Sequence, residues 1–494
     1  MKELLQKIVD KGFLVSPDLD IKESYLDEFI KYLEELPTKP LFVSGSTYND
    51  FLKKYETSKK ETNEEIEYNV IKHVEKREES DTKVKLKKFY NPTNKKVDIN
   101  DWLSYYSDRF ARLSNLLRSR LELTNIVSIS RILKMNGRQK VSTIGMIKDI
   151  GKTFTGITII EVEDPTGQIK VILKNEEVAK VSDELTFDEV IGIIGTKSKD
   201  VIYADKLIFP DIPYEPIKKA KDDVYAAFIS DTHVGSNMFL PKEFSMFTKW
   251  LKGNVGSQSQ RDMAKKVKYL FVIGDLVDGV GIYPGQEKEL LINDIYSQYK
   301  EFSKYFSDIP EDIQIIVIPG NHDALRLAEP QHILFEDIAR PVYQLNNITM
   351  ASNPAVVNIH NLDNFPGFDV LLYHGMSFDK IVSDVPFLRK YGYERADKIM
   401  EFLLRKRHLA PSHGSTLINP MARDFLVIDK PVDVFASGHI HYTKVGRYKN
   451  VATIGTGCFQ RKTPFQEKLG HNPTPGRVPI FSLKNNQVKI MRFL

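Results

Sequence analysis

The chain has one cysteine, no long apolar run and almost no net charge, and each shortage excludes a class of protein. Cys458 alone cannot form an internal disulfide, which excludes a disulfide-stapled secreted domain and favours a reducing compartment. No stretch approaches the roughly 18 uncharged apolar residues of a membrane span. Residues 1–13 carry charges throughout and lack the apolar stretch of a signal peptide. We therefore expect a soluble intracellular protein with no membrane partner.

The small net charge also limits how the chain could meet nucleic acid. Its 70 basic and 66 acidic residues give a net charge of +4, so the protein as a whole lacks the basic surface of many DNA-binding proteins. Any contact with DNA must then be local. The basic runs Lys218–Lys221 and Arg405–His408 are the candidates, although such runs are more often solvated faces.

The chain is long enough, and apolar enough, to form more than one hydrophobic core. A chain of 494 residues with 41% apolar residues exceeds one core, so we expect two or three domains. Residues 1–37 show helical periodicity and predict a small helical module, whereas residues 38–97 are rich in mixed charge and predict a flexible charged linker. Asp98 or Asn100 is placed to cap a helix that runs to about Glu122. We assign this helix, within residues 98–125, to packing.

Residues 126–212 contain five strand-like segments, with a short helix near Asn175 between the third and the fourth. This order is typical of an OB barrel, so we predict an OB-fold domain. Many OB barrels bind single strands and others bind only protein, and the fold alone does not decide between them. Phe154 and Tyr203 are the main candidates for base stacking.

The last region, residues 213–494, alternates short apolar runs with helical or loop stretches, which predicts strands buried on both faces. The predicted fold class is therefore multidomain α+β or α/β. Five polar motifs follow such runs directly: Asp231-Thr-His233, Gly274-Asp275, Gly320-Asn321-His322-Asp323, His374-Gly375 and Gly438-His439-Ile-His441. Because ligands gather beyond the carboxyl ends of strands in such sheets, we expect the motifs to share one site.

The residue types in these motifs suit a pair of divalent metal ions. Two ions about 4 Å apart can clamp the attacking and leaving oxygens of an in-line displacement at phosphorus when a carboxylate bridges them. Asp275 is the candidate bridge. The other predicted ligands are Asp231 with His233 for one ion, Asn321 with His374 for the other, and His439 and His441 divided between the two. Nitrogen and oxygen ligands without a thiolate suit manganese, iron, zinc or nickel, so residue types leave the ion open.

His322 has a different predicted role. It follows Asn321 in a tight turn, so its ring should face the substrate and donate to a phosphate oxygen or to the leaving group. Asp323 is the candidate for orienting that ring. We expect Cys458 to be inert packing, and the histidines outside the motifs to be surface or core residues: His73, His332, His360, His408, His413 and His471.

At the five motifs the chain resembles the calcineurin-like metallophosphoesterases. Their motif set is Asp-x-His, Gly-Asp, Gly-Asn-His-Asp, His and Gly-His-x-His, and the resemblance covers about residues 224–460. It implies two metal sites that share Asp275, the first completed by Asp231, His233 and His441 and the second by Asn321, His374 and His439. His322 and Asp323 stay the predicted catalytic residues.

Further segments narrow the resemblance. They are the OB barrel directly ahead of the phosphoesterase region, Ala324-Leu-Arg-Leu-Ala-Glu-Pro-Gln331, Tyr373-His-Gly-Met-Ser-Phe378 and Asn472-Pro-Thr-Pro-Gly476. From about residue 98 to its end the chain is similar to the small subunits of archaeal DNA polymerase D, which are related to the B-subunits of eukaryotic replicative polymerases. Phe459 stands where this family leads us to expect tryptophan, a change that should concern packing beside the site.

This resemblance implies a proofreading 3′–5′ exonuclease in DNA replication with two divalent ions, Mn²⁺ by preference, while Mg²⁺, iron, zinc and nickel are not excluded. It implies a heterodimer with the large polymerising subunit of DNA polymerase D, and DNA with single-stranded or frayed 3′ ends as substrate, in the cytoplasm at the nucleoid. Eukaryotic relatives have lost metal ligands and serve as scaffolds, so a scaffolding subunit is the alternative. A break-processing nuclease or a phosphatase with the same metal core is a third reading.

Overall fold

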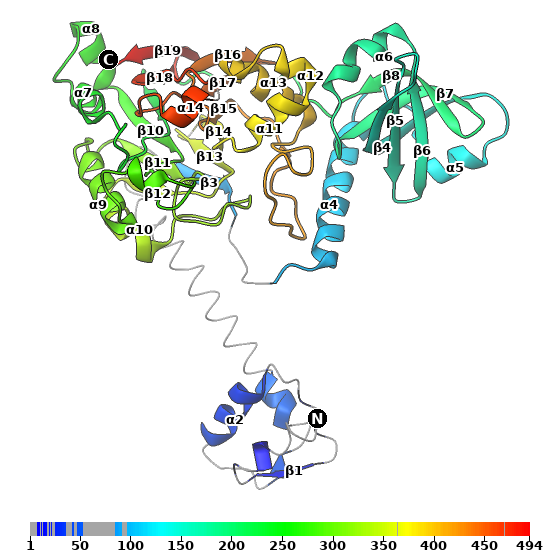
Figure 1. Ribbon diagram of the computed structural model, residues 1–494, viewed down its shortest axis with the longest axis horizontal. Coiled ribbons are helices and arrows are strands. Elements are labelled where there is room, and N and C mark those ends of the chain that lie inside the picture. The colour runs from blue at the N-terminus through cyan, green and yellow to red at the C-terminus, as the bar shows by residue number, and fades with distance from the viewer. Residues whose placement is uncertain are drawn as a thin grey trace. The chain divides into compact units, whose positions relative to one another are not determined.

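The computed structural model describes residues 96–494 except 363 and 469, residues 84–90, and parts of the segment 7–52. The chain forms two compact units, Met1–Asp81 and Thr82–Leu494, and each is considered by itself (Figure 1). Among the described residues, no helix combines the length and the apolar character that crossing a bilayer requires.

The N-terminal unit packs helix and sheet around an aromatic core. Its elements include β1 (Leu14–Val15), α2 (Leu26–Glu35) and β2 (Phe42–Val43), and the two strands pair in parallel. Phe29 of α2 is fully buried and contacts the rings of Tyr48 and Phe51, at centroid distances of 5.0 and 5.2 Å. The core thus continues past residues 1–37, because Tyr48 and Phe51, three positions apart, share a helical face.

Another strand lies within the segment 38–97 that the sequence predicts as a linker. β3 (Val84–Lys88) is the edge strand of a sheet and pairs antiparallel with β13 (Ala355–Ile359). Val84 and Leu86 pack against the core while the alternating lysines are the more exposed, a short period-2 pattern that the surrounding charge conceals. Residues 53–83 lie outside the described residues, and the predicted domain boundaries stay predictions.

A long helix precedes the barrel. α4 (Ile99–Arg118) is capped by Asp98, whose carboxylate accepts the N–H groups of Asn100 and Asp101 at 2.7 and 3.2 Å. The Asp101 carboxylate accepts the N–H of Asp98 in return, which completes a capping box. Asp98 is therefore the cap, and the helix ends before the predicted Glu122.

Five strands close a barrel in the order β4-β5-β6-β8-β7, as the OB pattern predicts. Its elements are α5 (Ile129–Lys134), β4 (Gln139–Lys152), β5 (Thr158–Asp164), β6 (Gly167–Leu173), α6 (Glu176–Val181), the 3₁₀ turn η2 (Ser182–Glu184), β7 (Val190–Ser198) and β8 (Val201–Ile208). The helix between the third and fourth strands is α6, capped by the Asn175 side chain. The predicted OB-like barrel is confirmed.

Two six-stranded sheets form the centre of the remaining region. The first has the order β12-β11-β10-β9-β18-β19, with β9 (Tyr225–Ile229), β10 (Val267–Ile273), β11 (Gln314–Ile318), β12 (Ile348–Met350), β18 (Arg477–Ser482) and β19 (Gln487–Arg492). The second has the order β16-β17-β15-β14-β13-β3, with β14 (Phe368–Tyr373), β15 (Val434–Ser437), β16 (Lys444–Tyr448) and β17 (Val451–Gly455). Strands β9, β10 and β11 run parallel, and so do β14 and β15.

The apolar runs of the central strands, such as β10 and β11, are buried on both faces. One core contains residues of both sheets, such as the stacked rings of Phe228 and Phe271 together with Val370 and Val434. Helices cover the outer faces: α7 (Pro241–Leu251), α8 (Gln258–Ala264), α9 (Ile295–Phe306) and α10 (Glu336–Tyr343) on the first sheet, and α11 (Ser377–Asp384), α12 (Pro386–Arg389), η4 (Tyr393–Arg395) and α13 (Ala396–Lys406) on the second. The 3₁₀ turn η3 (Gln286–Lys288) precedes α9, and α14 (Pro464–Lys468) lies between β17 and β18. The chain is thus a multidomain protein of mixed α and β structure, as predicted.

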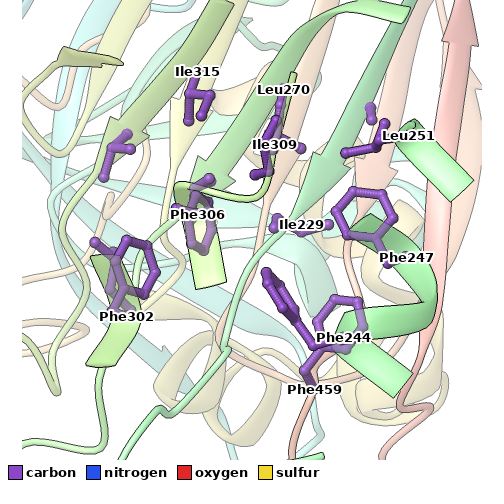
Figure 2. Close-up of a cluster of buried hydrophobic side chains, with 14 of the residues drawn as sticks. Ile229, Phe244, Phe247, Leu251, Leu270, Phe302, Phe306, Ile309, Ile315 and Phe459 are labelled. Carbon is purple, nitrogen blue, oxygen red and sulfur yellow. The ribbon is translucent and has the colours of Figure 1, made fainter. Parts of the chain in front are cut away.

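Figure 2 shows the core between the first sheet and its helices, where aromatic side chains of α7 and α9 meet strand residues such as Leu270 and Ile315. Phe459 belongs to this core, is 2% exposed and lies 4.9 Å from the ring of Phe244. The phenylalanine that stands in place of the expected tryptophan therefore affects packing beside the site, as predicted.

Candidate metal centre

The five motifs meet because each follows a strand whose carboxyl end points to the same edge of its sheet. Asp231 and His233 follow β9, Asp275 follows β10 and Asn321 follows β11. In the second sheet His374 follows β14, and His439 and His441 follow β15. Parallel strands bring their carboxyl ends together, so side chains from both sheets converge between them.

The first cluster contains Asp231, His233 and His441, all buried. The Nε2 atoms of His233 and His441 are 3.1 Å apart, and His441 Nε2 lies 3.3 Å from Asp231 Oδ1. Asp275 borders this cluster, with its Oδ2 3.8 Å from His233 Nε2. Two ligands about 2.1 Å from one ion and at about 90–110° to each other lie roughly 3.0–3.4 Å apart, so the separations of 3.1 and 3.3 Å fit a shared ion, and the 3.8 Å between Asp275 and His233 requires a wider ligand angle.

The second cluster contains Asp275, His374 and His439. His374 Nε2 lies 3.3 Å from Asp275 Oδ2 and 3.0 Å from Asn321 Oδ1. The ring of His439 stands 5.2 Å from that of His374. All seven predicted ligands thus lie in two neighbouring clusters with Asp275 between them, and their roles as ligands stay a prediction.

The backbone is strained at most of these positions. Five of the seven have left-handed φ angles: Asp231 (51°), His233 (48°), Asp275 (52°), His439 (71°) and His441 (54°). Such a conformation costs about 1–3 kcal/mol for a residue with a side chain and persists where the surrounding structure imposes it. Gly320 allows the closest approach, since a Cβ there would lie 2.2 Å from Asp275 Oδ1 and 2.8 Å from His374 Cε1.

The charges of the site are incomplete without cations. Asp231 and Asp275 are 0% and 2% exposed, and within the described chain only imidazoles come within ion-pair distance of them. Burial opposes ionisation of Asp275, but the neighbouring imidazoles, His374 first, outweigh it and hold its pKa well below the usual value. Burial likewise opposes the imidazolium of His374, yet the Asp275 carboxylate raises its pKa to about 10. Buried carboxylates whose negative charge is balanced only by imidazolium form a better site for divalent cations than for protons.

His322 lies at the edge of the first cluster. Its Nδ1 is 2.8 Å from the carbonyl oxygen of Asp278, which can only accept, so Nδ1 donates and Nε2 carries the lone pair. Its ring is 4.6 Å from that of His233, and burial lowers its pKa. The side chain is partly exposed, so Nε2 is the ring nitrogen left for a substrate.

Asp323 does not make the contact that the sequence suggested. Its carboxylate accepts the N–H of Gly320 at 2.8 Å and the hydroxyl of Tyr299 at 3.1 Å, and the Asp278 carbonyl orients His322 instead. Burial and the Asp275 charge raise the pKa of Asp323 to about 7. The reason is geometric, since the carboxylate turns back to satisfy the N–H of its own turn and so fixes the backbone that carries Asn321.

Two acidic residues at the site escaped sequence reasoning. Asp278 accepts from Nδ1 of His233 at 3.0 Å, and its signal was a second carboxylate in the loop that carries Asp275. Asp379, in α11, lies 3.0 Å from Nε2 of His439. No local pattern marks Asp379, because only the fold brings α11 to this edge.

One of the two basic runs of the sequence is used within the protein. In the run 405–408 the first three side chains contact Glu184, Glu189 and the Asp429 carbonyl, and His408 contacts Asp424. In the run 218–221, Lys218 pairs with Asp433 at 2.7 Å. The structure therefore does not offer the run 405–408 to phosphate, because distant acidic residues reach it first.

The remaining histidines and the cysteine have the structural contacts expected of them. His332, His360 and His413 contact the Ile333 carbonyl, Asp222 and the Tyr106 hydroxyl. The ring of His471 contacts that of Tyr393, with centroids 4.5 Å apart, and His73 lies outside the described residues. Burial raises the pKa of the Cys458 thiol to about 12, which makes it unreactive.

The fold and the site together define a calcineurin-like phosphoesterase, and that family matches residues 225–443. The chain is 43% identical over 399 residues to the DNA polymerase II small subunit of Methanothermobacter thermautotrophicus, covering 80% of each chain. It is 41% identical over 390 residues to that of Methanocaldococcus jannaschii, covering 78% of this chain and 64% of the relative. The chain belongs to the family of DNA polymerase II small subunits, which confirms the resemblance.

A solved archaeal phosphodiesterase is a more distant relation. It is 13% identical, with a TM-score of 0.25, and the match covers 55% of this chain and 99% of that one. The likeness is too distant to inform function. The phosphoesterase family implies divalent metal ions, and the donor set above fits them.

Proposed function

We propose that this chain is the nuclease subunit of a heterodimeric replicative DNA polymerase, and that it removes nucleotides as a two-metal 3′–5′ exonuclease with a proofreading role. One observation carries the proposal: two clusters of buried oxygen and nitrogen donors meet at Asp275 without a lysine or arginine among the described residues to balance them. Membership of the polymerase small-subunit family supports DNA as the substrate and a large polymerising subunit as the partner. The proposed location is the cytoplasm, at the nucleoid.

Residues of the chain would hold and orient the reactants as follows. Asp231, His233 and His441 would hold one divalent ion and Asn321, His374 and His439 the other, with Asp275 shared and Mn²⁺ as the proposed ion. When bound, two such ions neutralise charge on the attacking and leaving oxygens of a phosphodiester. His322 would use Nε2 to take up a proton, and then donate it to a phosphate or leaving oxygen, while the Asp278 carbonyl keeps Nδ1 protonated.

The proposed substrate is a single-stranded or frayed 3′ end. Every ligand side chain is buried or half-buried between two sheets, a placement that favours entry of one strand over a duplex. The barrel offers Phe154, fully exposed in the β4–β5 loop, and the 38% exposed Tyr203 for stacking on bases. A surface of this kind tolerates any sequence, as a proofreading nuclease requires.

A scaffolding role is the second candidate, and a surface groove favours it. The groove has a volume of about 770 Å³ and lies between α4 and the barrel, lined by Trp102, Tyr106 and Phe110 on one side and Met146 on the other. Leu103 at its edge is 62% exposed. An apolar groove of this size suits a segment of a partner chain, so nuclease and scaffold are compatible roles.

The deciding experiment compares purified wild-type chain with His374→Ala on a 3′-labelled single strand in Mn²⁺. We expect stepwise loss of 3′ nucleotides by the wild type and no cleavage by the variant. His360→Ala is the matched control, because it removes another buried imidazole outside the site. Cleavage that persists in His374→Ala, or that is absent from the wild type, would reject the exonuclease proposal and leave the scaffolding role as the proposed function. A preference for phosphomonoesters would indicate a phosphatase. Preferential cleavage at DNA breaks would indicate a break-processing nuclease.

A further inference from the structure

The segment that follows the Gly-Asn-His-Asp turn, residues 324–331, has no role in the mechanism above, yet it ends in polar side chains that are fully buried. Glu329 and Gln331 are both 0% exposed, as is Asn353, which follows β12. Polar side chains that are buried to this degree normally have hydrogen-bond partners for their polar atoms. Their partners show what they hold.

Gln331 reaches the turn that carries Asn321. Its Nε2 donates to the carbonyl of Gly320 at 3.1 Å and to that of Arg326 at 3.2 Å. Its Oε1 accepts from Nδ2 of Asn353 at 2.8 Å. The side chain thus connects the end of β11, in the first sheet, with Asn353.

Asn353 reaches the other sheet. Its Oδ1 accepts the backbone N–H of His374 at 2.9 Å, directly after β14. Its Nδ2 also donates to Glu329 at 3.2 Å, and Glu329 accepts the hydroxyl of Tyr373 at 2.9 Å. Two backbone bonds between Gln331 and Asn353, of 2.7 and 3.0 Å, hold the pair together.

We propose that Gln331, Asn353 and Glu329 form a brace across the two sheets and act as positioning residues that set the distance between Asn321 and His374. The inference rests on the proposed function, since it gives these two side chains the same ion. Asn321 and His374 come from different sheets, so no single sheet fixes their separation. The brace bonds the residue before Asn321 and the backbone of His374 through one connected network of buried amides.

The packing at Gly320 makes the ligand positions sensitive to this brace. A Cβ at Gly320 would approach both Asp275 and His374 within 3 Å, so the turn has no free space in which to relax. A shift of Gly320 would therefore be transmitted to the ligand atoms. Removing partners that orient metal ligands typically lowers metal affinity about 10–100-fold.

The test is Mn²⁺ binding to the full chain, measured by electron paramagnetic resonance of the free ion. We expect the wild type to bind two Mn²⁺ and Asn353→Leu to bind one of them at least about 10-fold more weakly. Asn358→Leu is the matched control: Asn358 is also 0% exposed, and its Nδ2 makes two hydrogen bonds, of 3.1 and 2.7 Å, away from the site. We expect this control to bind both ions as the wild type does.

A second variant tests the other end of the brace. Gln331→Met removes the side-chain bonds to Gly320, Arg326 and Asn353 but leaves the two backbone bonds to Asn353 and the bond from His374 to Asn353 in place. It should weaken the binding of one Mn²⁺ in the same way. Thermal melts would show which variants are folded before binding is compared. Equal Mn²⁺ affinity in either folded variant and in Asn358→Leu would overturn the brace. A wild type that fails to bind two Mn²⁺ would instead reject the metal centre, and with it the proposed function.

Discussion

Two buried clusters of the Thr82–Leu494 unit each combine a carboxylate with imidazole, but they differ in what balances the charge of the carboxylate. Beside α4, Asp424 accepts hydrogen bonds from Nε of Arg109 and from Nε2 of His408, both at 2.8 Å. At the strand ends, Asp275 faces His374 at 3.3 Å and His233 at 3.8 Å. One carboxylate has a permanent cation beside it, whereas the described residues give the other only imidazoles.

The cluster beside α4 is complete within the chain. Arg109 also donates to the Pro411 carbonyl at 2.7 Å and to the Tyr105 hydroxyl at 2.8 Å, and Nδ1 of His408 accepts the N–H of Ala410 at 3.0 Å. The network joins α4 to the loop between α13 and β15, which lies beside this helix in Figure 1, and it needs no ligand. A buried carboxylate that lacks such a cation therefore indicates function, and one that has it indicates structure.

Exchanging each carboxylate for its amide gives the largest expected effect. Asp275→Asn should lower the rate of 3′ nucleotide removal by at least about 10³-fold, because several kcal/mol of transition-state stabilisation depend on the shared ligand. Asp424→Asn should leave the rate per folded molecule unchanged and lower stability. Single-turnover rates in Mn²⁺ and thermal melts in EDTA measure the two quantities. A large rate loss in Asp424→Asn would remove the contrast between the clusters.

The next effect is on stability. Arg109→Met leaves the Asp424 carboxylate buried without its cation, which should cost about 3–5 kcal/mol of unfolding free energy. Arg112→Met, on the same helix, is the control. Its side chain bonds the backbone carbonyl of Asp424 but not the carboxylate, and its ion-pair partners Asp108 and Asp429 are 24% and 28% exposed, so water can solvate their charges and its loss should cost less, about 1 kcal/mol. Urea unfolding measures both. Equal losses would mean that the Arg109 pair does not behave as a buried one.

The sequence predicted the strand-end cluster better than the cluster beside α4, for a physical reason. Each ligand of the former follows an apolar strand, so a local pattern already places it at a sheet edge. Arg109 and Asp424 are far apart along the chain and neither belongs to a motif, so only the folded chain pairs them. The run at 405–408 suggested a DNA contact for the same reason, since its acidic partners Glu184 and Glu189 lie in a different region of the chain.

Orientation within the site was also beyond local pattern. The sequence placed Asp323 beside His322 because the two are neighbours, yet the turn directs its carboxylate to backbone N–H groups and leaves the orienting contact to Asp278. Asp379 reaches His439 from a helix of the second sheet. Hydrogen-bond direction follows from backbone angles that neighbouring residue types do not determine.

The smallest expected effect is a pH dependence from His408. Burial first, and then the charge of Arg109, lower the pKa of His408 to about 4 from 6.5. The hydrogen bond from the Ala410 N–H to Nδ1 acts in the same direction, because a proton on Nδ1 would set two donors against each other. The neutral ring therefore stabilises the fold above pH 6.5, and this contribution, about 3 kcal/mol, should be lost as the pH falls to 4. His408→Gln keeps a donor for Asp424 and cannot titrate. The measured quantity is the difference in unfolding free energy between wild type and His408→Gln, because other buried groups, including Asp323 and Glu329, contribute equally to both proteins. This difference should shrink as the pH falls from 7 to 4. A difference that stays constant would mean that folding leaves the pKa of His408 at its usual value. A difference that grows as the pH falls would mean that His408 is already charged beside Asp424, so that both clusters contain imidazolium.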